Sequence, residues 1–294
     1  MKSILIHFGT HKTGSTSLQQ FCARAADQLK DDGILYPKSG RADALPWGHH
    51  VLAWSVQKER GFVDLEGWEE VAAEIRESSA SKVLISSEGF SRCSRLQVER
   101  IKSLLPNVKI KGVVYLRNPI EYMISLYKQH ITGKSETRSF ESFAKDMICK
   151  CDYPAMVKRW ERGLGQSVIV RSFNESVERG RLESDFLQVL GVTLEDYEAY
   201  ITEPANISLS SERLAAVRWV NRLQKQGWMP SEFLHRVKRN VLRGTWRGRC
   251  FARMVQVVHQ KELCPREDIH WLEDRVSEES RRLAAGGTRG GPTS

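Results

Sequence analysis

The chain has 294 residues, of which 40% are hydrophobic and 28% are charged, and its formal net charge is +9. This composition is ordinary for a globular protein, and the length suits one α/β domain with additions. No apolar run approaches the roughly 20 residues of a membrane-spanning helix and no secretory signal is evident, so we expect a cytoplasmic protein. The six cysteines lack CxxC spacing and are expected to be reduced thiols.

Short apolar segments alternate with helical periodicity through the first two thirds of the chain. Strands are expected at 3–8, 34–37, 82–87, 109–116 and 168–170. Helices are expected at 18–29, 67–79, 95–105 and 181–190, with one more directly after the strand at 109–116. This alternation predicts βαβ units, and hence an α/β fold whose central parallel sheet is flanked by helices. Residues 1–204 are expected to form this core.

The last third of the chain has no strand signal. Helices are expected at 210–226, 230–241, 249–262 and 266–284, so residues 205–285 should form a helical C-terminal extension packed on the core. The glycine-rich tail 286–294 is expected to be disordered. Between Arg213 and Arg253 there are eleven Lys and Arg but one acid, Glu232. Such one-sided charge indicates either a solvated helical surface or a site for an anionic ligand.

The first predicted strand runs into a loop bounded by Gly9 and Gly14, which opens a helix. Unpaired backbone N–H groups and the helix dipole make such a loop a site for phosphate or sulfate. Four hydroxyl groups can add donors: those of Thr13, Ser15, Thr16 and Ser17. The two glycines have the P-loop separation, but the residue after Gly14 is Ser15, and the loop lysine is Lys12. The loop therefore keeps the anion site of a P-loop-type fold without the lysine that reaches β- and γ-phosphates.

A second motif, Arg117-Asn118-Pro119, follows the strand at 109–116. Asn118 suits an N-cap, and Pro119 suits the first position of a helix. Ser125 lies about two turns along that helix, so that Arg117 and Ser125 could converge on one phosphate.

Segments 9–19 and 115–127 together resemble the PAPS-dependent sulfotransferase superfamily, and most closely its bacterial and glycan-directed branch. The resemblance implies transfer of a sulfuryl group from 3′-phosphoadenosine 5′-phosphosulfate (PAPS) to a hydroxyl or amine of a glycan or small-molecule acceptor, with release of adenosine 3′,5′-bisphosphate. It implies that Lys12 contacts the bridging and sulfuryl oxygens, and that Arg117 and Ser125 hold the 3′-phosphate. The 5′-phosphosulfate would lie on a loop made of His11, Lys12, Thr13, Gly14, Ser15, Thr16 and Ser17.

Many members of the superfamily also close over the 3′-phosphate with a segment rich in Arg, Lys and Gly near the C-terminus. No clear copy of that segment occurs here, and 243–249 is a weak substitute. Which residues cover the nucleotide therefore stays open.

The catalytic base has three candidates. Glu88 comes directly after the predicted strand at 82–87, where ligands bind in parallel sheets. His49 and His50 follow a loop at 40–48 and are alternatives, as a base or as acceptor contacts. Two histidines alone do not make a metal site, and no metal is expected.

Two other functional classes stay open: a P-loop nucleotide kinase and a non-catalytic polyanion-binding protein. No specific nucleic-acid partner is expected, and assembly into a homodimer stays open.

Overall fold

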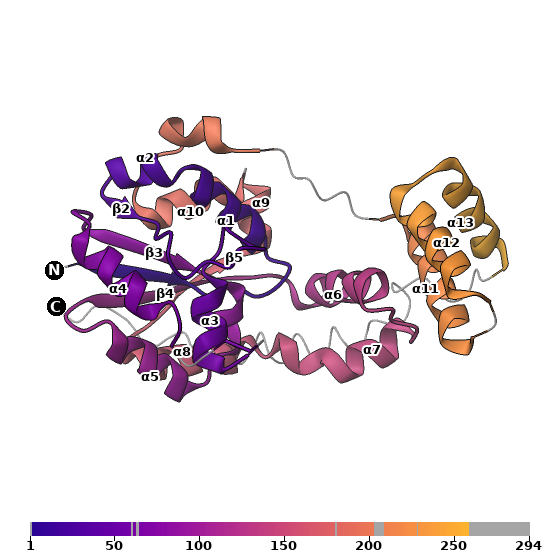
Figure 1. The fold of residues 1–294 in the computed structure, drawn as a ribbon, viewed down its shortest axis with the longest axis horizontal. Helices are drawn as coiled ribbons and strands as arrows, with labels where there is room; N and C mark the ends of the chain where they lie inside the picture. The colour runs from indigo at the N-terminus through magenta and orange to yellow at the C-terminus, as the bar shows by residue number, and fades with distance from the viewer. Residues whose placement is uncertain are drawn as a thin grey trace. The chain divides into compact units, whose positions relative to one another are not determined.

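The computed structural model describes residues 2–59, 61–62, 65–179, 181–202, 209–227 and 229–258. Two compact units make up the chain: Met1–Asn118 with Tyr153–Pro204, and Pro119–Asp152 with Ala205–Ser294 (Figure 1). Residues 119–152 thus group with the C-terminal helices rather than with the rest of residues 1–204. The expected helix at 266–284 and the tail at 286–294 lie outside the described residues.

The first unit is built on five parallel strands: β1 (Ser3–His7), β2 (Ile34–Leu35), β3 (Lys82–Ser86), β4 (Lys109–Leu116) and β5 (Ile169–Ser172). Their order in the sheet is β2-β3-β1-β4-β5. All five predicted strands, and the α/β class, are confirmed. The chain first builds the sheet to one side of β1 and then crosses to the other, so the direction of winding reverses at β1. In open parallel sheets, ligands bind at the carboxyl ends of the strands beside such a reversal.

Helices cover both faces of this sheet (Figure 1). On one face lie α1 (Ser15–Arg24), α2 (Ala26–Asp31) and α10 (Leu182–Leu190), and on the other α5 (Arg95–Leu104) and α8 (Tyr153–Leu164). Phe21 of α1 and Phe186 of α10 are fully buried in one apolar core with strand residues such as Val113. On the opposite face, the ring of Trp160 from α8 stacks on Phe8, with 4.1 Å between ring centroids.

The remaining elements of the first unit are mostly short. They are α3 (His50–Gln57), η1 (Glu88–Arg92), α4 (Trp68–Glu77), α9 (Phe173–Glu178) and η3 (Glu195–Tyr200). The predicted helix at 18–29 is divided at Ala25 into α1 and α2. The helices α3, α8 and α9 were not predicted.

The second unit is helical throughout its described part. It comprises α6 (Pro119–Gly133), α7 (Phe140–Met147), η2 (Ile148–Cys151), α11 (Ser211–Gln226), α12 (Ser231–Arg243) and α13 (Trp246–Val258). The apolar face of α6, including Met123 and Tyr127, shares one core with Leu214 and Val217 of α11. This shared core is the physical reason why 119–152 belongs with the C-terminal helices.

Two further expectations concern the described residues as a whole. None of the helices in the described ranges is both long enough and apolar enough to cross a membrane. Among the cysteines of the described ranges, Cys22, Cys93 and Cys151 are buried while Cys149 and Cys250 are exposed; Cys264 lies outside those ranges, and the reduced state of all six stays a prediction.

Gly248 sets the contact between α12 and α13. A Cβ atom at this position would lie 2.2 Å from the carbonyl oxygen of Asn240, which is main chain and cannot move aside. We therefore expect Gly248→Ala to lower the free energy of unfolding of the second unit by about 1–3 kcal/mol, the usual scale for overpacking.

Urea unfolding followed by circular dichroism would measure this change. Gly133→Ala is the matched control, because a Cβ there meets nothing within 4 Å and the residue ends α6 of the same unit. It should be neutral or slightly stabilising, since alanine favours helix more than glycine does. Equal effects of the two substitutions would contradict the role given to Gly248.

Candidate active site

Three neighbouring strands of the first unit each deliver one candidate residue at the same edge of the sheet. The loop containing Lys12 follows β1, Glu88 follows β3 and Arg117 follows β4. Because β1 pairs in parallel with β3 on one side and with β4 on the other, these three carboxyl ends lie next to one another. The topology thus places the loop at 9–14 between Glu88 and Arg117; we call it the anion loop after the role predicted for it.

The loop after β1 has a sharply turned backbone. Lys12 and Gly14 both adopt left-handed conformations, with φ angles of 66° and 71°. A Cβ at Gly14 would meet Cδ2 of Leu182 on α10, so both the backbone angle and the space favour glycine here. Gly14 is also the residue from which α1 begins. The turn therefore opens directly onto the first helical N–H groups, which have no partner within the helix.

The hydroxyl groups of the loop do not all have the same role. Thr13 is fully buried and donates through Oγ1 to the carbonyl oxygen of Thr10 at 2.7 Å, so it stabilises the turn itself. Ser17 is exposed and donates to Oε1 of Glu183 on α10 at 2.8 Å. Oγ1 of Thr10 is buried and has no hydrogen-bond partner among the described residues. A buried donor without an acceptor fits a loop that receives an anion.

Lys12 and Arg117 are directly connected. Nη1 of Arg117 donates to the main-chain oxygen of Lys12 at 3.2 Å, and its guanidinium lies over the ring of Phe173, 5.2 Å from the centroid. Partial burial, and then the charge of Arg117, lower the pKa of the Lys12 amine below its usual value. The two cations therefore lie together at the carboxyl ends of β1 and β4.

The other residues predicted to bind the donor are more dispersed than Lys12 and Arg117. His11 and Thr16 are exposed at the loop and at the first turn of α1. Ser125 is half-buried on α6, in the second unit. Its convergence with Arg117 on one phosphate stays a prediction.

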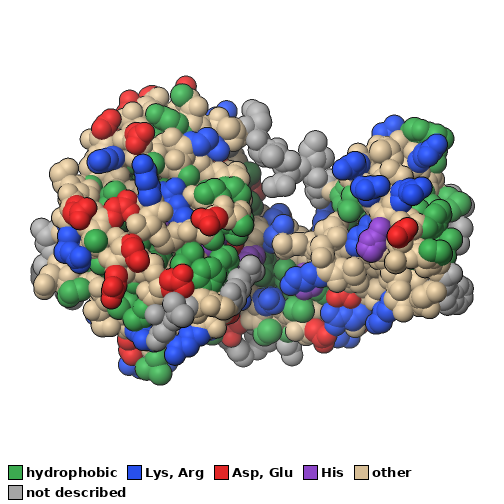
Figure 2. All heavy atoms as spheres, viewed as in Figure 1, with side chains coloured by type: hydrophobic (Ala, Val, Ile, Leu, Met, Phe, Trp, Pro, Cys, Tyr) green, Lys and Arg blue, Asp and Glu red, His purple; other side chains and the backbone are tan. Residues whose placement is uncertain are grey.

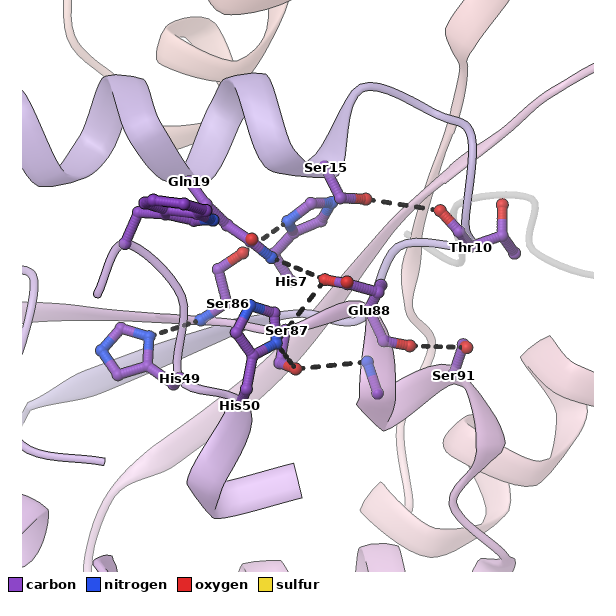
Figure 3. A network of polar contacts seen from close by, with 12 residues as sticks. His7, Thr10, Ser15, Gln19, His49, His50, Ser86, Ser87, Glu88 and Ser91 are labelled. Carbon is purple, nitrogen blue, oxygen red and sulfur yellow. Dashed lines mark hydrogen bonds and ion pairs between the residues drawn. The ribbon is translucent and has the colours of Figure 1, made fainter. Parts of the chain in front are cut away.

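Glu88 lies in a network of polar side chains, which Figure 3 shows from close by. Its Oε2 accepts a hydrogen bond from Nε2 of Gln19 at 3.0 Å and lies 3.8 Å from Nδ1 of His50. The main-chain oxygen of Glu88 accepts from the hydroxyl of Ser91 at 2.7 Å. The Glu88 side chain keeps 21% of its surface exposed, so it is held in place yet accessible.

The Glu88 carboxyl is adapted to carry a negative charge. Burial by itself would raise its pKa, but the charge of His50 and the hydrogen bond from Gln19 outweigh burial and hold the pKa below the ordinary glutamate value. Glu88 is therefore ionised at neutral pH. Both of these contacts fall on Oε2, and a hydrogen bond from the backbone N–H of Glu88 also helps to lower the pKa of the carboxyl.

The two adjacent histidines have different surroundings. His49 is fully buried, its Nδ1 accepts from the backbone N–H of Ser86 at 3.1 Å, and its Nε2 lies 3.0 Å from the carbonyl oxygen of Pro37. Since Nδ1 is the acceptor, Nε2 carries the proton and donates to Pro37. Burial, followed by the charge of Arg41, lowers the pKa of His49 to about 3. Both ring nitrogens are occupied by the main chain, so His49 has neither a free proton nor a free lone pair to offer a substrate.

His50 is the histidine that faces the carboxylate. Its Nδ1 lies 3.0 Å from Oγ of Ser87, which also accepts from the N–H of Gly89 at 3.2 Å. The ring stacks on Trp54, with centroids 5.5 Å apart and planes inclined by 21°. The structure therefore joins Glu88 with His50, and places His49 in the supporting core.

Gln19 is the functional residue that the sequence analysis missed. It is fully buried on α1, one turn after Ser15, and it provides the hydrogen bond that orients Glu88. Its Oε1 has no partner among the described residues. The sequence feature that could have indicated Gln19 is its polar side chain within the apolar stripe formed by Leu18, Phe21 and Cys22.

No group of three His, Cys, Asp or Glu side chains suited to a metal ion occurs within the described ranges. The expectation of a reaction without a metal stays a prediction.

No protein-family profile and no curated protein sequence matches the chain. Among solved structures, the chain is similar to a sulfotransferase from Alicyclobacillus acidocaldarius, at 17% sequence identity and a TM-score of 0.47. The alignment covers 80% of this chain and 99% of that one. The function is therefore inferred from the residues of the site.

Proposed function

We propose that this protein is a sulfotransferase that uses PAPS as donor and a hydroxyl or amine of a glycan or small molecule as acceptor. One observation carries the proposal. The anion loop, with Lys12 bonded through its main chain to Arg117, lies at the strand end next to the one that bears the ionised Glu88. A transfer from a phosphorylated donor needs cations where the leaving group gathers charge, and a base where the acceptor loses its proton.

PAPS supplies the sulfuryl group, and the chain supplies the positioning and the charges. The acceptor oxygen or nitrogen forms a bond to sulfur while the bond from sulfur to the bridging oxygen breaks. Lys12 and the loop N–H groups stabilise the negative charge that moves onto the bridging oxygen, and the bisphosphate departs. Oε1 of Glu88 accepts the proton of the acceptor, so that charge and atoms balance.

The partners of Glu88 have distinct roles in this proposal. Gln19 is a positioning residue, because its amide fixes Oε2 and leaves Oε1 toward the acceptor. His50 stabilises the ionised carboxylate from 3.8 Å away, and Trp54 holds its ring. His49 takes no part in the chemistry.

The donor can be tested by thermal denaturation. A ligand that binds only the native state stabilises it by about 2.7 kcal/mol at 100 times its Kd, so a saturating donor raises the melting temperature measurably. Adenosine 3′,5′-bisphosphate should do so, and magnesium-ATP much less, because the residue after Gly14 is Ser15 rather than lysine. Equal or greater stabilisation by magnesium-ATP would point to a nucleotide kinase instead.

Arg117 is expected to distinguish the two ends of the donor. Arg117→Ala should weaken binding of the bisphosphate by about 1.5–3 kcal/mol, the usual scale for a hydrogen bond to a charged group. Adenosine 5′-phosphosulfate, which lacks the 3′-phosphate, should lose less, since it would feel only the missing bond to the Lys12 carbonyl. Isothermal titration calorimetry with both ligands measures the difference. Equal losses would assign Arg117 a purely structural role in the loop.

A further inference from the structure

The second unit has a charged surface that the proposed reaction does not use. Five of the eleven cations between Arg213 and Arg253 bond to oxygens of their own unit: Arg213, Arg218, Arg222, Lys238 and Arg249. The other six are Lys225, Arg236, Arg239, Arg243, Arg247 and Arg253, and all six are exposed. Within the described ranges, no ion pair joins any of these six to an acid. The structure thus separates cations that hold the unit together from cations that face solvent.

Large apolar side chains are exposed on the same helices. Phe233 on α12 is 48% exposed, and Trp246 and Met254 on α13 are 64% and 55% exposed. Seven large hydrophobic side chains are exposed in the described parts of the molecule, and four of them fall between 229 and 254. That concentration makes these side chains part of a surface, since single exposed apolar residues are scattered on most proteins.

The cations and the apolar side chains interleave on two adjoining helices. Trp246, Arg253 and Met254 lie seven and eight residues apart, which places them on one face of α13. The close approach of Gly248 to Asn240 brings the start of α13 against the end of α12, next to Arg243. We call the whole set the basic apolar face: Phe233, Arg236, Arg239, Arg243, Trp246, Arg247, Arg253 and Met254. Figure 2 shows Lys and Arg side chains gathered over the part of this unit that α12 and α13 occupy.

We propose that the basic apolar face binds the surface of an anionic lipid membrane. Arginines bind phosphate head groups, while tryptophan, phenylalanine and methionine enter the boundary between head groups and acyl chains. A nucleic acid or an anionic polysaccharide would use the arginines, and bases could stack on the aromatic rings, but neither polymer offers Met254 an apolar phase. The interleaving of both kinds of side chain therefore favours lipid as the occupant. This binding is peripheral and independent of the proposed sulfuryl transfer.

Co-sedimentation of the full chain with vesicles tests the proposal. Vesicles of equimolar phosphatidylcholine and phosphatidylglycerol should bind on the order of tenfold more protein than vesicles of phosphatidylcholine alone, and high salt should weaken the binding. Equal binding to the two compositions, or no binding to either, would overturn the proposal whatever the variants do.

Paired variants separate the two contributions. The charge variant Arg243→Glu with Arg247→Glu should lose about tenfold in binding to the anionic vesicles, and the matched control is Lys30→Glu with Lys158→Glu on exposed positions of the first unit. The apolar variant Trp246→Ser with Met254→Ser should lose a similar factor, and its control is Leu96→Ser, which is 74% exposed on α5.

The apolar variant also decides between lipid and polymer. If it binds the anionic vesicles as well as the wild type, and heparin or DNA competes for the same arginines, the face is a site for a polyanion and the lipid proposal is wrong. Circular dichroism of each variant shows whether it is folded, and the comparison of vesicle compositions with the wild-type chain needs no variant.

Discussion

Glu88→Gln is expected to reduce sulfuryl transfer by about 10²–10⁴, the range found when a general base is removed. The substitution keeps the size of the side chain and an oxygen that can accept the hydrogen bond from Gln19, so the local fold should be unchanged. Donor affinity should stay near that of the wild type, because Glu88 acts on the acceptor proton. Single-turnover measurements with labelled PAPS and a panel of acceptors, analysed for products that gain one sulfuryl group, would measure the loss.

The pH dependence of the same reaction gives an independent test. His50 and Gln19 outweigh burial and hold the pKa of Glu88 below the ordinary glutamate value, so the carboxylate stays ionised as the pH falls through that value. The acid limb of turnover should therefore lie below the range of an unperturbed glutamate, and Glu88→Gln should abolish that limb. Glu99→Gln, which removes a carboxylate paired with Arg95 on α5, is the control and should leave turnover unchanged. If Glu88→Gln transfers at the wild-type rate, His50 becomes the next candidate for the base.

Lys12→Ala is expected to lower turnover by about 10²–10³, as when one donor to a developing oxyanion is removed. The lysine should contact the donor in the ground state, and more strongly once charge moves onto the bridging oxygen. Affinity for the donor should therefore fall modestly while turnover falls severely. Titration of the donor against the native protein, together with transfer rates at saturation, separates the two effects.

Lys58→Ala provides a matched control for that substitution. Lys12 and Lys58 both have left-handed backbones, with φ angles of 66° and 54°, and alanine is strained there to about the same degree as lysine. Lys58 is the residue directly after α3 and belongs to neither the loop at 9–14 nor its helix. Equal loss of turnover in both variants would mean that the loss is not specific to the Lys12 amine.

The sequence predicted the sheet because each strand is an apolar run between turn signals, and burial on both faces makes β2 and β3 especially easy to find. Extensive burial is also the reason why α3 was not predicted. Seven of its eight residues are buried, so it has no polar face and no helical period. The grouping of 119–152 with the C-terminal helices was beyond the sequence, because it depends on contacts between α6 and α11, which lie far apart along the chain.

The candidate site residues that directly follow strands could be predicted from the sequence. Those whose role depends on the direction of a side chain could not. Lys12, Glu88 and Arg117 each follow a strand, and parallel pairing alone brings them to one edge. His49 and His50 are adjacent in the sequence and cannot be separated by pattern. Only the structure shows that His49 faces the main chain at Ser86 while His50 faces Glu88.

The position of β1 in the sheet also affects how the protein is made. It is the first strand to be synthesised, yet it lies between β3 and β4, whose residues pair with it from Lys82 and from Lys109. This apolar strand therefore stays unpaired until β3 and β4 have been synthesised. Its pairing with β4 cannot form until more than a hundred further residues have followed it. Such non-local pairing slows folding and exposes an aggregation-prone segment in the meantime. We expect the nascent chain to depend on chaperones until β4 is complete, and the anion loop to be assembled only at that stage.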